Sequence, residues 1–416
     1  MMTYFKRQLE KLLAQTANTR PLVYLNGPRQ VGKSTLAEHI QTDKVINSVS
    51  FDSPLVLTAA KADPIGFIQS LPLDRLNIID EVQKAPEIFV QLKIAIDQAR
   101  KTPKNTSLFI LTGSANILAV PTLAQELVGR MSILTLLPFS ASEYKQTGKN
   151  FIDRLWHDRL EYKEYKNTDI IDVIANATFP EIAIEDRINR VQWFDDYLTT
   201  ILQRDIMTLE NIRSPEKIVQ LLISLSQRVG SLLNNANIMK ETGLDAKTYE
   251  KYKALIINTF LTYEVEPWSK PNKLNKRFVK KTKLYFSDTN LLCYIMRRDL
   301  RDIYKNDPLV MGHIFENFIA SEIMKNLKSL ADISVSHFNL SDGKEVDFVL
   351  ENRHDEAIGI EVKLDKTVSD QDFANIRLLQ KTLDSKFKRG IVLYAGNTLL
   401  PFGNNIWAVP INYLWE

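Results

Sequence analysis

The first residues that suggest chemistry form a phosphate-binding pattern near the N-terminus. The chain contains the run Gly27-Pro28-Arg29-Gln30-Val31-Gly32-Lys33-Ser34, which matches G-x-x-x-x-G-K-[ST] without departure. The two glycines let the backbone turn so that its N–H groups point at phosphate oxygens. Lys33 offers its charge to the β- and γ-phosphates, and Ser34 offers a hydroxyl to Mg²⁺. The pattern predicts a site for ATP and Mg²⁺, with these nucleotide-binding residues: Gly27, Pro28, Arg29, Gln30, Val31, Gly32, Lys33, Ser34 and Thr35.

Two adjacent carboxylates continue the same pattern downstream. The apolar run at 76–79 ends in Asp80 and Glu81. Such a pair at the end of a strand that follows a phosphate loop is the Walker B arrangement. We expect Asp80 to bind the metal with Ser34, and Glu81 to polarise the attacking water as a catalytic residue.

Two more residues are candidates for the same site. Ser114 follows the apolar run at 108–112 and is predicted to sense the γ-phosphate. Arg130 precedes another apolar run and is predicted to act as an arginine finger, a catalytic role that cancels charge on the phosphoryl group. A plainer alternative stays open for each, namely a polar residue that ends a strand and an ordinary surface arginine.

A second set of chemical residues lies near the C-terminus. Asp347 falls on one apolar run and Glu361-Val-Lys363 on the next. Strand alternation puts Glu361 and Lys363 on one face, because they are two residues apart. Asp347, Glu361 and the upstream Glu316 would bind a second Mg²⁺ or Mn²⁺, and Lys363 would position or deprotonate the water, giving the catalytic set Asp347, Glu361 and Lys363. The alternatives are a solvent-facing charged strand and a non-cutting docking platform.

A helix, a glycine turn and a second helix are predicted between 237 and 252. Their spacing is that of a helix-turn-helix, with Asp245 as the cap of the second helix. A basic stretch without acidic residues follows, and as the wing of a winged helix it would contact nucleic-acid phosphates. The alternative is a solvated hairpin in a winged helix that binds protein. The basic residues are Lys270, Lys273, Lys276, Arg277, Lys280, Lys281 and Lys283.

The elements that must position these residues predict an α/β protein of four parts. Apolar runs at 22–26, 45–51, 76–80 and 108–112 alternate with helical patterns, which is typical of a parallel sheet covered on both faces. We predict a P-loop domain with an N-terminal helix at 1–140, a helical lid region at 141–215 and a winged-helix-like domain at 216–300. An α/β domain similar to restriction nucleases is expected at 301–416.

Composition restricts the classes of protein that fit. The 416 residues are 44% hydrophobic and 25% charged, as in a globular protein of several domains. The net charge of +3 says little about partners, so a nucleic-acid surface must be local. One cysteine, Cys293, excludes a disulfide framework. With no signal peptide and no apolar run long enough to span a bilayer, we expect a cytoplasmic protein without a membrane partner.

Motifs spread along most of the chain resemble a known family. They include Ile79-Asp-Glu-Val-Gln-Lys, Thr112-Gly-Ser114 and Leu137-Pro-Phe-Ser in the first part, and Leu202-Gln-Arg204 and Gly312-His-Ile-Phe-Glu316 further on. The chain resembles a prokaryotic family of AAA-superfamily P-loop ATPases that carry an uncharacterised C-terminal domain, here similar to PD-(D/E)XK nucleases. The resemblance implies an AAA-type ATPase core, and it implies that Arg204 lies near the nucleotide, in the same chain or across a subunit interface.

Two hypotheses of function follow. In the first, a Mg²⁺-dependent ATPase couples ATP binding and hydrolysis to nucleic acid, with DNA as the expected partner, and the C-terminal domain is a candidate metal-dependent nuclease. In the second, the chain is an ATP-dependent conformational switch whose non-cutting C-terminal domain binds a protein partner. Both allow a homo-oligomer, in which Arg130 or Arg204 would serve a neighbouring subunit.

Overall fold

A computed structural model describes residues 4–100, 108–114, 127, 129–206, 214–268, 281–330, 332–340 and 343–416. Most of the expected basic stretch, from Lys270 to Lys280, lies outside these residues. Across the described ranges, no helix combines the length and apolarity needed to cross a membrane.

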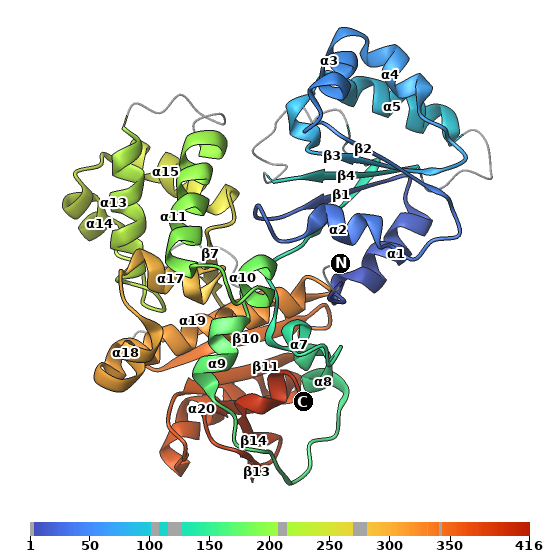
Figure 1. Cartoon of the computed structure of the whole chain (residues 1–416). Coiled ribbons are helices and arrows are strands. Elements are labelled where there is room, and N and C mark those ends of the chain that lie inside the picture. The colour runs from blue at the N-terminus through green and yellow to red at the C-terminus, as the bar shows by residue number, and fades with distance from the viewer. Residues whose placement is uncertain are drawn as a thin grey trace.

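The first part of the chain is a five-stranded parallel sheet between two layers of helices (Figure 1). The strand order is β2-β3-β4-β1-β5. Alternate residues of β1 serve the two layers: Val23 packs in the core with α1 and α2, whereas Leu22 and Tyr24 pack in the core with α5. The elements are α1 (Leu9–Thr19), β1 (Leu22–Asn26), α2 (Lys33–Glu38), β2 (Ile46–Ser50), α3 (Pro54–Ala62), α4 (Pro64–Ser70), β3 (Leu76–Asp80), η1 (Val82–Lys84), α5 (Ile88–Ala99), β4 (Phe109–Gly113) and β5 (Met131–Thr135).

The middle of the chain is mainly helical. Polar caps begin several of its helices: the side chain of Asn189 accepts hydrogen bonds at the start of α11, and that of Asp245 does the same for α15. Gly243 ends α14 in a left-handed conformation with φ of 60°. The elements are α7 (Ala141–Tyr144), α8 (Phe151–His157), β6 (Lys163–Glu164), α9 (Ile170–Asn176), α10 (Pro180–Ile184), α11 (Arg190–Thr200), the π-helix η3 (Ile201–Ile206), α13 (Pro215–Ser226), α14 (Asn235–Thr242), α15 (Ala246–Asn258), α17 (Thr289–Ile295) and α18 (Leu300–Asn306).

A mixed sheet of nine strands occupies the lower part of the molecule in Figure 1, in the order β6-β13-β14-β12-β11-β10-β9-β7-β8. The helix α19 covers one face and α20 the other, and α20 comes so close that a Cβ on Gly359 would lie 2.6 Å from Leu379. The elements are β7 (Thr262–Pro267), β8 (Lys283–Phe286), α19 (Pro308–Leu327), β9 (Ile333–Asn339), β10 (Glu345–Asn352), β11 (Ala357–Lys363), η5 (Asp370–Phe373), α20 (Ala374–Leu383), η6 (Asp384–Lys386), β12 (Phe387–Tyr394), β13 (Thr398–Gly403), β14 (Ile406–Pro410) and η7 (Ile411–Leu414).

The α/β class and the parallel sheet of the first part are confirmed. The expected helix pair with its glycine turn is present as α14 and α15. The large sheet takes β6, β7 and β8 from the expected lid and winged-helix regions, so it continues across the expected boundaries at 215 and 300. The four-part division and the nuclease-like character of the last part stay predictions.

Candidate functional site

The phosphate loop connects β1 to α2 through backbone conformations that favour glycine. Gly27 has φ of 142°, and a Cβ there would lie 2.0 Å from the carbonyl oxygen of Leu136. Gly32 has φ of 85° and caps α2. Side chains other than hydrogen are therefore excluded at Gly27 by contact and disfavoured at Gly32 by conformation.

The Lys33 side chain folds back over this loop. Its Nζ donates to the carbonyl oxygens of Gly27 at 3.0 Å and Pro28 at 2.6 Å. Only 7% of the residue is exposed, so the charge is held at the loop rather than in solvent. Because both acceptors are neutral carbonyls, phosphate oxygens of a nucleotide can take over these bonds with a gain in charge pairing.

The two expected metal-binding residues lie together. Ser34 Oγ donates to Asp80 Oδ1 at 2.8 Å, and the hydroxyls of Thr112 and Ser50 also bond to Asp80. A hydroxyl and a carboxylate joined in this way are the hard oxygen ligands that Mg²⁺ takes beside phosphates. The residues present therefore fit Mg²⁺.

Glu81 is held in an uncommon conformation next to this pair. Its φ of 55° is left-handed, and it begins the short helix η1. The amide of Gln83 bonds to Glu81 Oε2 and also donates to Ser114 Oγ at 3.2 Å. Gln83 thus links Glu81 to Ser114, which the sequence assigned to the γ-phosphate. Gln83 was not predicted as a site residue from the sequence. The signal that could have identified it is its position two residues after Glu81.

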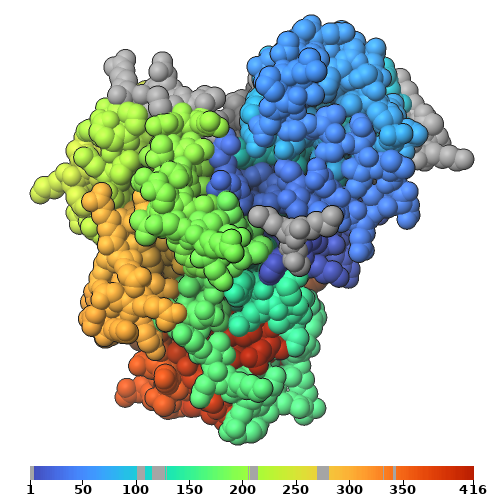
Figure 2. Space-filling view, in the orientation of Figure 1, coloured from blue at the N-terminus to red at the C-terminus, as the bar shows by residue number. Residues whose placement is uncertain are grey.

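Lys33, Ser34 and Glu81 line a cavity of about 550 Å³ whose two walls come from distant parts of the chain. In Figure 2 the helices around α11, in green, abut the first domain, in blue. One wall is Arg29, Gln30, Gly32, Lys33, Ser34, Thr35 and Glu81, and the other is Glu181, Trp193, Asp196, Tyr197, Thr200 and Arg204. Gly27, Pro28 and Val31 shape the loop behind this lining.

The second wall has a rigid aromatic base. The rings of Trp193 and Tyr197 stack with centroids 5.2 Å apart and planes within 7°. Trp193 Nε1 donates to Glu181 Oε2 at 2.9 Å, which fixes the ring. Arg204 lies one turn beyond α11 and lines the cavity of its own chain. The sequence left open whether Arg204 acts in the same chain, and the structure brings it to the phosphate loop of that chain.

Arg130 is the one predicted residue of the phosphate site that lies elsewhere. Its guanidinium is paired with Asp97 of α5, with Nε 2.8 Å from Oδ1 and Nη2 2.9 Å from Oδ2. In the parallel register Leu22 is opposite Met131, so Arg130 lies where β1 begins. The phosphate loop follows the other end of β1, a strand length of roughly 15 Å away. Arg130 therefore lies away from the phosphate loop of its own chain, and an arginine-finger role for it, which would have to serve a neighbouring subunit, stays a prediction.

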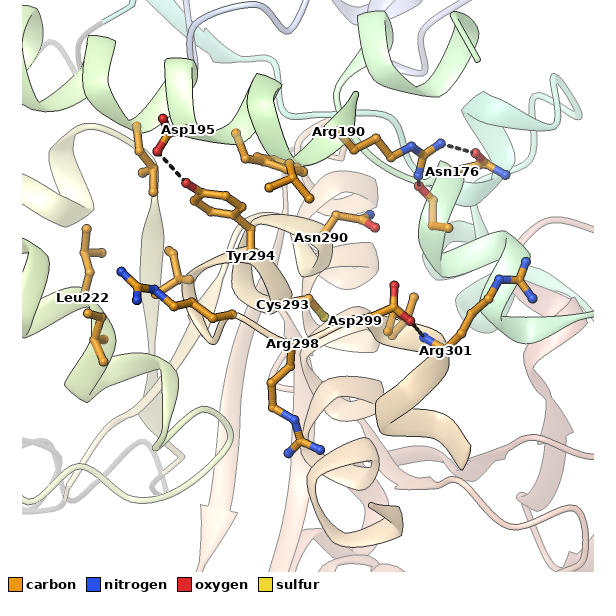
Figure 3. A pocket seen from close by; sticks show the side chains of 18 of the residues that line it. Asn176, Arg190, Asp195, Leu222, Asn290, Cys293, Tyr294, Arg298, Asp299 and Arg301 are labelled. Carbon is orange, nitrogen blue, oxygen red and sulfur yellow. Dashed lines mark hydrogen bonds between the residues drawn. The ribbon is translucent and has the colours of Figure 1, made fainter. Parts of the chain in front are cut away.

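On the opposite side of α11 lies a larger cavity of about 1040 Å³ (Figure 3). Tyr294 of α17 lines this cavity, and its hydroxyl donates a hydrogen bond to Asp195 Oδ1 at 2.8 Å. Phe194 and Leu198 of α11 line this cavity, whereas Trp193 and Tyr197 line the phosphate cavity. The helix α11 therefore separates the two cavities and contacts both.

The C-terminal residues singled out in the sequence also come together. Four side chains form what we call the carboxylate cluster: Glu316 of α19, Glu345 and Asp347 of β10, and Glu361 of β11. Lys363 Nζ lies 3.4 Å from Glu361 Oε1, and the backbone N–H of Val362 donates to Asp347 Oδ2 at 2.9 Å.

The centre of the carboxylate cluster is taken by Lys283 of β8. Its Nζ lies 3.0 Å from Glu316 Oε1 and 3.4 Å from Asp347 Oδ1, and it is also ion-paired with Glu345. From the sequence, Lys283 was predicted to be one of the basic residues of a phosphate-contacting wing. That assignment is wrong, because only 1% of the residue is exposed.

Burial changes the ionisation of the carboxylate cluster. It raises the pKa of Glu361 to about 9 and the pKa of Glu316 to about 7, with the Asp347 charge adding to both. Burial alone would lower the pKa of Lys283, but Asp347, Glu316 and Glu345 together raise it above its ordinary value. Lys283 therefore stays charged beside the carboxylates that raise its pKa.

A divalent metal does not fit this arrangement. In the part of the chain that the structure describes, no three His, Cys, Asp or Glu residues are grouped to hold a metal ion. Glu316, Asp347 and Glu361 were predicted to do so, and the prediction is corrected because an ammonium ion lies between the first two. The signal that was missed is strand alternation, which places Lys283 with Tyr285 and Glu345 with Asp347 on shared faces.

Three family models match separate stretches of the chain. Residues 19–145 match an AAA domain, residues 167–302 a domain of unknown function (DUF8612), and residues 311–414 another domain of unknown function (DUF4143). The chain is also similar to the uncharacterized proteins Rv2008c of Mycobacterium tuberculosis and Mb2031c of Mycobacterium bovis. Both are 24% identical over 411 residues, which cover 98% of this chain and 84% of the relatives.

Solved structures with partial similarity include P-loop proteins. The Walker-type ATPase PABY2304 of Pyrococcus abyssi gives a TM-score of 0.40 at 13% identity and covers 71% of this chain and 96% of its own. A RuvB mutant of Thermotoga maritima gives 0.30 at 19% identity and covers 62% and 88%. The Orc1 protein of Aeropyrum pernix, solved in complex with DNA, gives 0.26 at 13% identity and covers 74% and 94%.

Proposed function

From the AAA domain at residues 19–145 as the premise, we propose that this chain is a Mg²⁺-dependent ATPase. The observation that supports it most is the hydrogen bond of Ser34 to Asp80 beside a separately positioned Glu81, with Ser34 and Glu81 lining one cavity. A protein that only bound nucleotide would not need a carboxylate fixed for water beside the metal-binding one.

Several residues in and beside the cavity have roles in this proposal. The loop N–H groups and Lys33 bind the phosphates, and Ser34 and Asp80 hold Mg²⁺. When bound, Mg²⁺ would supply positive charge that neutralises the phosphates. Glu81, oriented by Gln83, accepts a proton from the attacking water. Arg204 offers a second positive charge from the opposite wall of the cavity.

Steady-state ATP hydrolysis with Mg²⁺ tests the proposal. Lys33→Ala is expected to abolish turnover, and Lys44→Ala, a change outside the cavity, is expected to leave it intact. Equal turnover in wild type and Lys33→Ala would contradict the proposal.

Engagement of nucleic acid is a second candidate, favoured by the helix pair α14 and α15 with its Gly243 turn. The arrangement resembles the DNA-reading helix-turn-helix. It predicts DNA affinity that falls steeply with salt and responds to ATP. Fluorescence anisotropy between low and high salt tests this. A shallow or absent salt dependence favours instead the ATP-dependent switch, with a C-terminal domain that binds a protein partner without cutting DNA.

A further inference from the structure

The carboxylate cluster contains a cation that the chain itself provides. An ammonium group has three N–H donors, and three acidic side chains surround Lys283 Nζ: Glu316, Glu345 and Asp347. The number of donors matches the number of acidic partners. The three carboxylates thus surround the Lys283 ammonium group as protein ligands surround a bound cation.

Neighbouring groups fix the position of Lys283 and of its partners. Tyr285 Oη donates to Glu316 Oε1 at 2.6 Å, on the same strand face as Lys283. Gly230 has φ of 73°, and a Cβ there would lie 2.9 Å from Glu316 Oε2. Leu232 forms a β-bridge with Lys283 on the side away from β7. These contacts hold the Glu316 carboxylate and the backbone of β8 in place beside the ammonium group.

The composition of the cluster shows what it would take in place of Lys283. Its four carboxyl groups lie with two lysines, Lys283 and Lys363, so removal of Lys283 leaves one lysine beside four carboxyl groups. Glu361 Oε2 is buried and has no hydrogen-bond partner among the described residues. Carboxylate oxygens of this kind bind hard divalent cations. Without the lysine charge, Glu316, Asp347 and Glu361 would present such oxygens to one space.

We propose that Lys283 is an internal cation in the position where an Asp…Glu-x-Lys set otherwise holds a divalent metal. The wild-type C-terminal domain is therefore metal-free, and the loss of one ammonium group converts it into a divalent-cation site. The inference extends beyond ATP hydrolysis and does not depend on it.

Mn²⁺ binding to the full chain, followed by electron paramagnetic resonance without nucleotide, tests the proposal. The phosphate loop lacks phosphate oxygens under these conditions, so it does not compete for the ion. Wild type is compared with Lys283→Met and with Lys281→Met, which changes an exposed lysine two residues away. Wild type and Lys281→Met are expected to leave Mn²⁺ free, whereas Lys283→Met binds one ion. Adding Asp347→Asn to Lys283→Met is expected to weaken that binding by about 10-fold or more.

Two results would overturn the proposal. One is a wild-type chain that binds Mn²⁺ and releases it on Asp347→Asn, since the cluster would then hold a metal beside Lys283. The other is a Lys283→Met chain that neither binds Mn²⁺ nor gains thermal stability from it. The second readout covers a variant that folds only with the ion, because Mn²⁺ must then raise its melting midpoint.

Discussion

The phosphate site and the carboxylate cluster use the same two kinds of side chain and arrange them in opposite ways. In the phosphate site, Lys33 donates to neutral carbonyls of the loop, and Asp80 accepts from neutral hydroxyls. In the carboxylate cluster, Lys283 is paired directly with carboxylates. A lysine bonded to neutral groups can bind an anionic ligand with a gain in charge pairing. A buried lysine bonded to carboxylates is already paired and stabilises the fold instead.

The largest expected effect is on ATP turnover, when the same Glu→Gln substitution is made in the phosphate site and in the carboxylate cluster. Glu81→Gln should lower ATP turnover by about 10²- to 10⁴-fold, because it removes a general base. ATP binding should persist, since the loop and Asp80 are intact. Glu361→Gln makes the same change in the carboxylate cluster and should leave turnover unchanged. Turnover and nucleotide affinity are measured for both variants. Loss of turnover in both would contradict the claim that the carboxylate cluster takes no part in ATP hydrolysis.

The two lysines should differ in what they stabilise. Lys283→Ala leaves buried carboxylates without their partner and should lower the free energy of unfolding by about 3–5 kcal/mol. Lys33→Ala should cost much less, because its acceptors in the loop are neutral carbonyls. Urea unfolding of both variants, with Lys281→Ala as the exposed control, makes the comparison. A similar cost for Lys33→Ala and Lys283→Ala would contradict it.

Arg204 tests whether the phosphate site is complete within one chain. Arg204→Ala should slow turnover by about 10-fold or more, a barrier increase of about 1.4 kcal/mol. Mixing Arg204→Ala with Lys33→Ala should not restore activity if Arg204 acts in its own chain. Restored turnover in the mixture would place Arg204 at a subunit interface. Arg130→Ala is the matched arginine variant, and in a monomer its turnover should equal wild type.

The last comparison concerns the pH dependence of stability in the carboxylate cluster. Burial raises the pKa of Glu316 to about 7 and the pKa of Glu361 to about 9, from an ordinary value of 4.5. The folded chain then keeps protons that the unfolded chain releases, so the contribution of these two groups to stability is full below about pH 4.5 and is lost as the pH rises to 9. Glu361→Gln should flatten the decline between pH 7 and 9. Unfolding midpoints across this range test it, with the exposed Glu161→Gln as control.

The sequence predicted the phosphate loop, Asp80 and the strands beside them because each depends on local pattern. Glycine conformations, the apolar run and the terminal carboxylates all lie within a few residues of one another. The facing wall of α11 could not be found this way, since Trp193 and Tyr197 meet the loop only through the path of the intervening chain. Arg204 was expected near the nucleotide only from the family resemblance.

Lys283 is a second case in which contacts between distant parts of the chain could not be predicted from a local pattern. In the sequence it ends a basic stretch, and its charge suggested exposure. Its burial depends on pairing of β8 with β7 and with Leu232, and on the arrival of Glu316, Glu345 and Asp347 from later elements. The expected residues of the C-terminal site were thus brought together as predicted, but the ion among them was misidentified.

Counting the divalent ions bound by one chain tests the account most directly. The Glu81→Gln variant retains ATP, so bound Mn²⁺ can be counted with and without saturating ATP. We expect one ion per chain with ATP, held by Ser34 and Asp80, and none without it. Two ions with ATP, or one ion without it, would contradict the claim that the phosphate site takes a metal and the carboxylate cluster takes Lys283.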